Sequence, residues 1–334
     1  MKFLGTAILL ALINFCLVFA RPNDKQQSNE FFYFWITGAS HKATIVGLSD
    51  KSLVDITVPQ YFVVDGERYY VDEIGYSAFS GSKIKSITIG SNIEKITLSG
   101  FSFAECKELK TFTIDSPKVF VNTMAFHKAN PNMVIKGSGV PAFVKSLGEG
   151  IAKGWGFKIN KDYTNLTQTE RKRDLFNLAK NLNNHVTFDG NTDQGNAAVA
   201  LALRHASWGG ISRAYYQLAL IIGIKDTEVL IGGDAAVSAW NYVKVDGKWY
   251  NVDVSRFNFN TYKTYSNVFF YTKSGFSKFL NTEQPSGKYN NTPSRWVVVK
   301  DLIHYQGEAN YHGTTNFDSY LRINDLGTRT FKNQ

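Results

Sequence analysis

The residues best suited to chemistry in this 334-residue chain are its two cysteines and six histidines. A cysteine thiolate can act as a nucleophile or metal ligand, and histidine is the commonest general base. Cys16 lies in an apolar N-terminal run, which leaves Cys106 alone in the rest of the chain. Five histidines are scattered without a second ligand at metal-site spacing, namely His41, His127, His185, His304 and His312. Because glycine-rich phosphate loops and dinucleotide fingerprints are also missing from the sequence, we expect no metal and no cofactor.

Residues 1–20 have the pattern of a secretory signal peptide. Met1 and Lys2 precede an apolar run from Ile8 to Phe19, which the small residue Ala20 closes. The run is shorter than the roughly 20 apolar residues of a membrane-spanning helix, and no later stretch is long and apolar enough to cross a bilayer. We therefore expect a secreted, extracellular protein without a transmembrane segment.

Export sets the expectations for disulfides, charge and glycosylation. With Cys106 alone, the mature chain has no internal disulfide even in an oxidising compartment. The net charge of +9 favours loose association with acidic partners but identifies none. The basic run 171–173 is interpreted as the solvated face of an amphipathic helix. The sequons at Asn165 and Asn290 are candidate glycosylation sites.

A repeat with a period of 23 to 24 residues runs from residue 70 to residue 136. An Ala-Phe or related pair returns in each copy, and a short apolar alternation follows it, as in Ile87-x-Ile89 and Phe112-x-Ile114. These alternations predict short strands with alternate residues directed inward. The aromatic positions are expected to stack inside a solenoid, and they are Phe79, Phe103 and Phe126. Cys106 is expected to be a small buried hydrophobic residue.

The repeat resembles the BspA-like leucine-rich repeats over about residues 45–160, and we assign residues 30–160 to this domain. The flanks also resemble that family, with Ile56-Thr57-Val58-Pro59 before the first repeat and Gly137-Ser138-Gly139, a helix and Gly156-Phe157-Lys158-Ile159 after the last. The resemblance implies an open, curved surface without chemistry, which binds a partner or packs against the neighbouring domain.

From Thr167 the apolar pattern becomes helical, with Leu175, Leu178, Ala179 and Leu182 on one face. Further helices are predicted over Gln194–Ala206 and Ile211–Ile222. Strands are predicted over Glu228–Ile231, Ala239–Val245 and Lys248–Asp253, the last two joined by a turn at Asp246-Gly247. The overall expectation is an α+β two-domain protein, a short solenoid followed by helices and an antiparallel sheet.

The second half resembles the transglutaminase-like, papain-related fold over about residues 167–280, and we assign residues 165–305 to that domain and 306–334 to a polar C-terminal segment. Family members carry Gly-Val-Cys at a helix start, His-Ala-Trp-Asn before a hairpin and Trp-Tyr-x-x-Asp after it. The matching stretches here are Gly210-Ile211-Ser212, Ser238-Ala239-Trp240-Asn241 and Trp249-Tyr250-Asn251-Val252-Asp253.

The resemblance places Ser212 at the nucleophile, Ser238 at the base and Asp253 at the orienting carboxylate, and only Asp253 keeps the family residue. A serine hydroxyl stays protonated without a base, and Ser238 does not accept a proton at neutral pH. His205 is a poor substitute, because in a straight helix it would lie about 10 Å from Ser212. Losing members of such a unit lowers the rate by orders of magnitude, so no catalytic residue is expected.

If a cleft survives, the expected lining residues are Trp208, Tyr215, Trp240, Asn241, Trp249 and Tyr250. Our leading hypothesis is a secreted, non-catalytic binding or adhesion protein whose partner is an extracellular protein, peptide or glycan and not a nucleic acid. The alternatives are a serine-dependent hydrolase or acyltransferase using Ser212, and a structural component of an extracellular coat or matrix. Three repeats offer little area for an interface of about 800 Å² per partner, so we expect binding to need both domains across the junction near residues 155–170.

Overall fold

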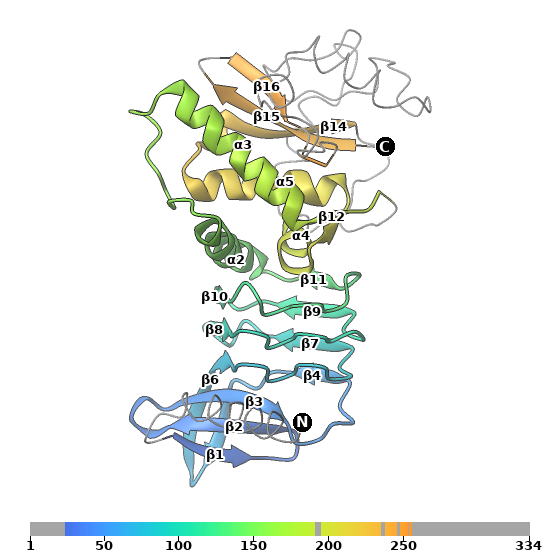
Figure 1. Cartoon of the computed structure of the whole chain (residues 1–334). Coiled ribbons are helices and arrows are strands. Elements are labelled where there is room, and N and C mark those ends of the chain that lie inside the picture. Colours follow the sequence, from blue (N-terminus) through green and yellow to red (C-terminus); the bar gives the residue numbers. More distant parts are fainter. Residues whose placement is uncertain (1–23, 191–194, 235–237, 246–247, 253, 256–334) are drawn as a thin grey trace, which may run out of the picture.

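The computed structural model describes residues 24–190, 195–234, 238–245, 248–252 and 254–255. In Figure 1 the described residues form one elongated stack, with strands at one end, the repeats and then a crossing helix in the middle, and further helices with a small sheet at the other end. The predicted signal peptide, the predicted turn at Asp246-Gly247 and the segment 306–334 assigned as a polar C-terminal segment lie outside the described residues.

The first sheet of the solenoid has seven strands in the order β1-β2-β3-β6-β8-β10, with β5 paired to β6. Strands β1 to β3 form an antiparallel meander, and β3, β6, β8 and β10 then run parallel to one another. The strands are β1 (Asp24–Ser28), β2 (Phe32–Thr37), β3 (Lys42–Leu48), β5 (Tyr61–Val64), β6 (Glu67–Ile74), β8 (Lys95–Leu98) and β10 (Lys118–Val121). A short 3-10 turn, η1 (Gly38–Ser40), links β2 to β3.

The second sheet of the solenoid has four parallel strands in the order β11-β9-β7-β4. Along the chain its strands alternate with those of the first sheet, so each turn of the solenoid contributes to both. The strands are β4 (Asp55–Thr57), β7 (Ser86–Ile89), β9 (Thr111–Ile114) and β11 (Val134–Lys136). Strands β7 and β9 are the predicted Ile87-x-Ile89 and Phe112-x-Ile114 alternations, with these four residues buried as expected.

A column of phenylalanines fills the interior between the sheets. The ring centroids of Phe79 and Phe103 are 5.5 Å apart and those of Phe103 and Phe126 are 5.2 Å apart, which confirms the predicted stack. Backbone hydrogen bonds join the same corners, with the Phe79 N–H donating to Ser102 and the Phe103 N–H to Ala125. Each turn is therefore held to the next both by its aromatic ring and by its backbone.

Cys106 lies inside this column, as the sequence predicts for a small hydrophobic residue. Its Sγ donates a hydrogen bond to the carbonyl oxygen of Phe79 at 3.0 Å. Burial raises the pKa of the Cys106 thiol, so the nucleophilic thiolate is scarce at neutral pH. The environment is that of a structural thiol.

We expect iodoacetamide at pH 8 to alkylate Cys106 only when the chain unfolds, because the thiol is both inaccessible and protonated. The measurement is the intact mass of a chain beginning at Arg21, which lacks Cys16. A Ser80→Cys variant supplies an exposed thiol in the same solenoid as the control, and it should react on the order of 100-fold faster. Equal rates for the two thiols would show that Cys106 is accessible in the folded chain.

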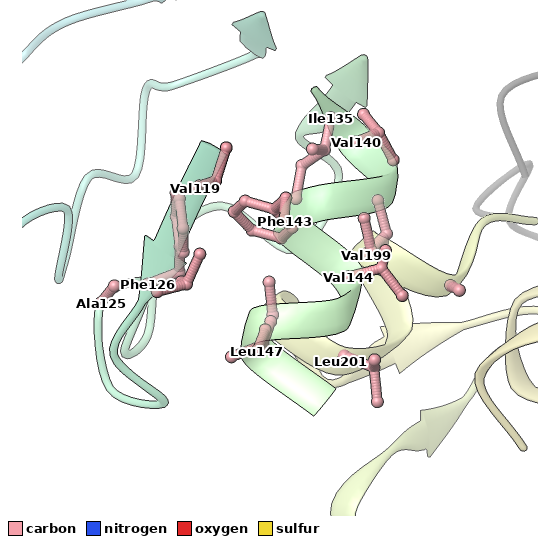
Figure 2. Packing of buried hydrophobic residues seen from close by; sticks show 14 of the residues in the cluster. Val119, Ala125, Phe126, Ile135, Val140, Phe143, Val144, Leu147, Val199 and Leu201 are labelled. Carbon is pink, nitrogen blue, oxygen red and sulfur yellow. The ribbon is translucent and has the colours of Figure 1, made fainter. Parts of the chain in front are cut away.

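Helix α2 (Val140–Gly154) closes the solenoid and begins the helical part of the molecule. One side packs on the repeats, where the Phe143 ring lies 5.8 Å from Phe126 and 6.2 Å from Phe112. The other side meets the next helices: an added Cβ on Gly148 would lie 2.5 Å from Cδ1 of Ile221. Figure 2 shows Phe143 directed toward Phe126, with Val144 on the other side of the helix, beside Val199 of α4 (Ala197–Leu203). The two parts of the chain therefore share one helix and one continuous core.

The helical part consists of three helices packed against a three-stranded antiparallel sheet in the order β14-β15-β16. The parallel-sheet solenoid followed by helices makes this a mixed α/β architecture. The helices are α3 (Gln168–His185), α4 (Ala197–Leu203) and α5 (Trp208–Ile222), and the strands are β14 (Val229–Asp234), β15 (Ser238–Val245) and β16 (Lys248–Val252). Smaller elements are β12 (Thr187–Phe188), β13 (His205–Ala206) and η2 (Asp226–Glu228).

The predicted helices are present with adjusted ends. Helix α3 begins after Thr167, whose side chain forms a capping box with Glu170, and its predicted apolar face is buried. Helix α4 is shorter than predicted, because Arg204 adopts a left-handed conformation and the chain leaves the helix before His205. Helix α5 starts at Trp208, three residues earlier than expected, with Ser207 at its N-cap. Among the described residues, no helix combines the length and apolarity needed to cross a membrane.

The prediction that the whole basic run 171–173 is solvated is wrong for its first residue. Arg171 is only 7% exposed, and its Nη2 lies 2.8 Å from Oε2 of Glu228 in an ion pair. Arg173 is exposed as expected. The difference follows from helix geometry: successive residues are turned by about 100°, so a run of three charges cannot occupy a single face. Glu228, 57 residues later in the chain, makes burial of the guanidinium tolerable.

Candidate functional site

Ser212, the residue that the resemblance aligns with the nucleophile, lies in the second turn of α5. Its side chain is 2% exposed. The Oγ donates a hydrogen bond to the carbonyl oxygen of Gly209, one turn earlier, at 3.2 Å. This is the usual way in which a serine inside a helix satisfies its hydroxyl. The hydroxyl is directed back into its own helix.

Asn241 joins this helix to the sheet. Its side-chain Nδ2 donates to the carbonyl oxygen of Ser212 at 3.0 Å, and the residue is fully buried. The asparagine therefore holds β15 against the first half of α5. This contact brings together two of the sequence stretches quoted for the transglutaminase-like resemblance, although they are 29 residues apart in the chain.

The aromatic residues expected around a cleft are placed at the interior of this unit. Tyr215 is fully buried on α5, and its hydroxyl donates to the carbonyl oxygen of Leu175 on α3 at 3.2 Å. Burial raises the pKa of Tyr215 well above its usual value. Trp240 is buried on β15. Trp208 is half-buried at the start of α5, with its ring 4.9 Å from that of Phe188.

The remaining positions of the proposed site are described only in part. Ser238 opens β15 and is paired in register with Asp234 of β14. On β16, Trp249 is opposite Lys244 and Tyr250 is opposite Val243. The side chains of Ser238, Trp249 and Tyr250, and the whole of Asp253, lie outside the described residues. The structure thus brings Ser212 and Asn241 together and leaves the positions of the base and carboxylate side chains open.

His205 does not share a helix with Ser212, so the straight-helix estimate of their separation does not apply. It lies in the short strand β13, which pairs with β12. Its Nε2 is 3.2 Å from Oδ2 of Asp189. This pairing with a carboxylate of the neighbouring segment gives His205 a local partner.

Of the two glycosylation candidates, the structure describes only Asn165. Asn165 is exposed in the turn that precedes α3, where a glycan has access to it. Asn290 lies outside the described residues. Within the part of the chain that the structure describes, no three His, Cys, Asp or Glu side chains gather as a metal site would require.

A surface pocket of about 380 Å³ lies at the junction between α2 and α3. It is formed by the segment that follows α2 and by one face of α3. Its lining residues are Trp155, Gly156, Phe157, Lys158, Lys161, Asp174, Asn177, Lys180 and Asn181. Binding across the junction near residues 155–170 is predicted from the sequence, but the lining residues of α3 are not. The sequence does place Asp174, Asn177 and Asn181 at spacings of three and four, which puts them on one face of a helix. The prediction of this helix used only the apolar stripe beside them.

Comparison with known proteins supports the first resemblance. Residues 66–148 match the family model described as the BspA type leucine rich repeat region, in six copies. This confirms the leucine-rich-repeat resemblance for that part of the chain. No curated protein matches the chain significantly. The transglutaminase-like resemblance has no counterpart in these comparisons and rests on the sequence stretches quoted above.

The chain is also similar to solved structures of leucine-rich repeat proteins. One is a leucine-rich repeat protein from Bacteroides capillosus ATCC 29799, with 18% identity, a TM-score of 0.27 and coverage of 34% of this chain and 93% of that one. A second is a leucine rich cell surface protein from Faecalibacterium prausnitzii A2-165, with 21% identity, a TM-score of 0.26 and coverage of 30% and 27%. A third, from Bacteroides ovatus ATCC 8483, has 16% identity, a TM-score of 0.22 and coverage of 36% and 37%.

Proposed function

We propose that this chain is a secreted binding protein in which leucine-rich repeats are joined to a degenerate transglutaminase-like scaffold that performs no catalysis. The observation that carries the proposal is the burial and hydrogen bonding of the Ser212 hydroxyl. A nucleophile must face its substrate and pass its proton to a base. The Ser212 hydroxyl is buried and gives its hydrogen to Gly209, so it presents neither an exposed oxygen nor a proton-transfer path.

The scaffold part of the proposal is supported by the order of elements and by one contact. A helix that carries the aligned nucleophile position packs against an antiparallel hairpin that carries the aligned Trp-Asn pair, and Asn241 bonds to the backbone of Ser212. Such a bond keeps the helix and hairpin in a fixed relation even where the reactive side chains have been replaced. The retained residues then serve packing, as the burial of Tyr215 and Trp240 indicates.

The repeat part offers a surface for binding. On the outer face of the seven-stranded sheet, register places one row of side chains across five strands, from Trp35 through Thr44, Glu73 and Thr97 to Phe120. Exposed aromatic residues on the same sheet are Tyr33, Tyr70 and Phe120. Aromatic residues of this kind are enriched at protein interfaces, because they bring a large contact area with little flexibility.

This face is small for a stable protein complex. Six strands at about 4.8 Å spacing span about 24 Å, and their lengths of four to eight residues correspond to about 13–27 Å. The resulting area of roughly 300–650 Å² falls short of the ~800 Å² per partner of a typical interface. The surface beyond the repeats is therefore needed, and the shared helix α2 makes the two parts act as one body. We accordingly place binding on the whole chain, with an extracellular protein, peptide or glycan as partner.

We expect a fluorophosphonate probe to leave Ser212 unlabelled, because its hydroxyl is buried and the aligned base position holds Ser238, which does not accept a proton at neutral pH. Peptide mapping of the treated full-length chain is the measurement, with a known serine hydrolase in parallel to show that the reagent is active. Hydrolysis and amide transfer on peptide and glutamine substrates should stay at the uncatalysed rate. The Ser212→Ala variant should be indistinguishable from the natural chain in both assays. Labelling or turnover that this variant abolishes would instead establish a serine-dependent hydrolase or acyltransferase.

A further inference from the structure

We infer that the pocket at the junction of α2 and α3 is a binding site for a carboxylated sugar unit, such as a uronic acid residue of an acidic glycan. The inference deepens the proposed function, since it names the ligand class that the non-catalytic binding protein would take. It rests on the shape, the charge and the hydrogen-bonding groups of residues 155–161 and 174–181.

The wall formed by residues 155–161 is held rigidly. The N–H of Trp155 donates to Ile151 and that of Phe157 to Ala152, each at 3.0 Å, with Gly156 in the left-handed conformation (φ 85°) between them. Farther on, the N–H of Lys161 donates to the carbonyl of Ile222 at the end of α5 at 2.9 Å. A wall fixed in this way needs little ordering when a ligand binds.

The charge of the pocket is positive. Three lysines line it, against the single carboxylate of Asp174. That carboxylate is already occupied: its Oδ2 accepts hydrogen bonds from Nζ of Lys161 at 2.6 Å and from the hydroxyl of Tyr163 at 3.1 Å. Among the residues that the structure describes, no carboxylate pairs with the exposed ammonium groups of Lys158 and Lys180. Two cations are therefore available to an anionic ligand.

The other polar groups suit hydroxyls better than a bare carboxylate. Asn177 and Asn181 are one turn apart on the same face of α3. Each amide supplies both donors and an acceptor, which is what a row of sugar hydroxyls requires. Trp155 and Phe157 add half-buried aromatic surface for the apolar face of a sugar ring. The combination of ammonium, amide and aromatic groups distinguishes the site from a simple anion site.

The size of the pocket favours one sugar unit. Its volume of about 380 Å³ is at the lower end of the range of ~300–1,000 Å³ for small-molecule sites. An extended peptide would need a longer groove. A small site with exposed lysines binds one unit weakly, so useful affinity for a polymer would come from several chains or several units acting together.

The test measures binding of glucuronate and of glucose to the full-length chain by titration calorimetry and by saturation-transfer NMR. The two probes share a ring and differ in the carboxylate. We expect a dissociation constant on the order of 1 mM for glucuronate and binding at least about tenfold weaker for glucose. Raising the salt concentration from about 20 to 500 mM should weaken glucuronate binding severalfold, because salt screens the charges of the exposed lysines. Equal binding of both sugars, or of neither, would overturn the inference.

Variants of the lining lysines test whether glucuronate binds in this pocket. The double variant Lys158→Met, Lys180→Met should bind glucuronate about tenfold more weakly. The control, Lys83→Met with Lys110→Met, removes two exposed lysines of the solenoid and should leave the affinity for glucuronate unchanged. All four side chains are exposed, so circular dichroism should show an intact fold. An equal loss in both pairs would mean that net charge alone attracts the ligand, and the pocket assignment would fail.

A second pair of variants separates a sugar from other carboxylates. The double variant Asn177→Ala, Asn181→Ala should bind glucuronate severalfold more weakly and acetate with unchanged affinity. The control Asn184→Ala, on the same helix, should change neither affinity. An acetylated dipeptide that binds as tightly as glucuronate would overturn the assignment to a sugar. The outcome is independent of the fluorophosphonate assay: labelling of Ser212 would contradict the non-catalytic proposal, and loss of glucuronate binding would contradict only the assigned ligand.

Discussion

Replacing Phe103 with alanine should lower the free energy of unfolding by about 3–5 kcal/mol. Phe103 is fully buried in the middle of the aromatic column, where its ring lies 5.5 Å from Phe79 and 5.2 Å from each of Phe126 and Phe112. The substitution removes the transfer free energy of the ring and leaves a cavity that both neighbouring turns line. Close-packed interiors relax only partly around such a cavity, and the lost aromatic pairs add to the cost.

The matched control is Phe120→Ala. Phe120 is 49% exposed on the outer face of β10, with Nζ of Lys95 5.2 Å from its ring centre. Its replacement should cost less than about 1 kcal/mol. Urea unfolding followed by tryptophan fluorescence measures both variants, and the two should share the m-value of the natural chain. Similar losses for Phe103 and Phe120 would contradict the view that the column stabilises the solenoid.

The second large effect is expected at Gly148, where α2 crosses α5. A Cβ at this position would lie 2.5 Å from Cδ1 of Ile221 and 3.5 Å from Cδ2 of Leu218. A leucine must displace the ends of these two buried side chains or widen the spacing of the helices, and overpacking of this kind costs about 1–3 kcal/mol. Because α2 carries the core from the solenoid into the helical part, Gly148→Leu should also reduce the cooperativity between them.

Gly154→Leu is the control for this prediction. Gly154 is the last residue of the same helix, and an added Cβ there would meet no atom within 4 Å. This change should alter the unfolding free energy by less than about 0.5 kcal/mol. Scanning calorimetry should show one transition for the natural chain and for Gly154→Leu, and a lowered or divided transition for Gly148→Leu. An unchanged single transition in Gly148→Leu would show that the two parts do not depend on this contact.

The interpretation of the repeat from sequence succeeded because its information is local and recurrent. Each turn presents the same aromatic and the same alternating pair to its neighbours, so the spacing of Phe79, Phe103 and Phe126 suffices to predict both the stack and the strands. The antiparallel meander of β1, β2 and β3 was not predicted as such. Its pairing to β6 depends on contacts between residues such as Thr44 and Glu73, which are 29 positions apart, with Thr44 lying before the repeat.

The sequence predicted that these helices are present but not the residues at which all of them begin and end. The apolar stripe of α3 identifies the helix, and the pair of Thr167 and Glu170 identifies its start. The end of α4 depends on a left-handed residue, Arg204, for which the sequence has no glycine or asparagine signal. The burial of Arg171 depends on Glu228 in a later segment, so no local pattern reveals it.

The sequence by itself determined the identity of the repeat and the change to helices after Thr167, because each follows from residue type and spacing. The alignment of Ser212 and Ser238 with a nucleophile and a base is what the transglutaminase-like resemblance implies, and it stays a prediction. Only the tertiary structure decided that the Ser212 hydroxyl is turned into its own helix, that α2 unites the two parts, and that lysines and asparagines from two segments surround one pocket. These features depend on which distant segments pack together, and packing is a property of the whole core rather than of any local stretch.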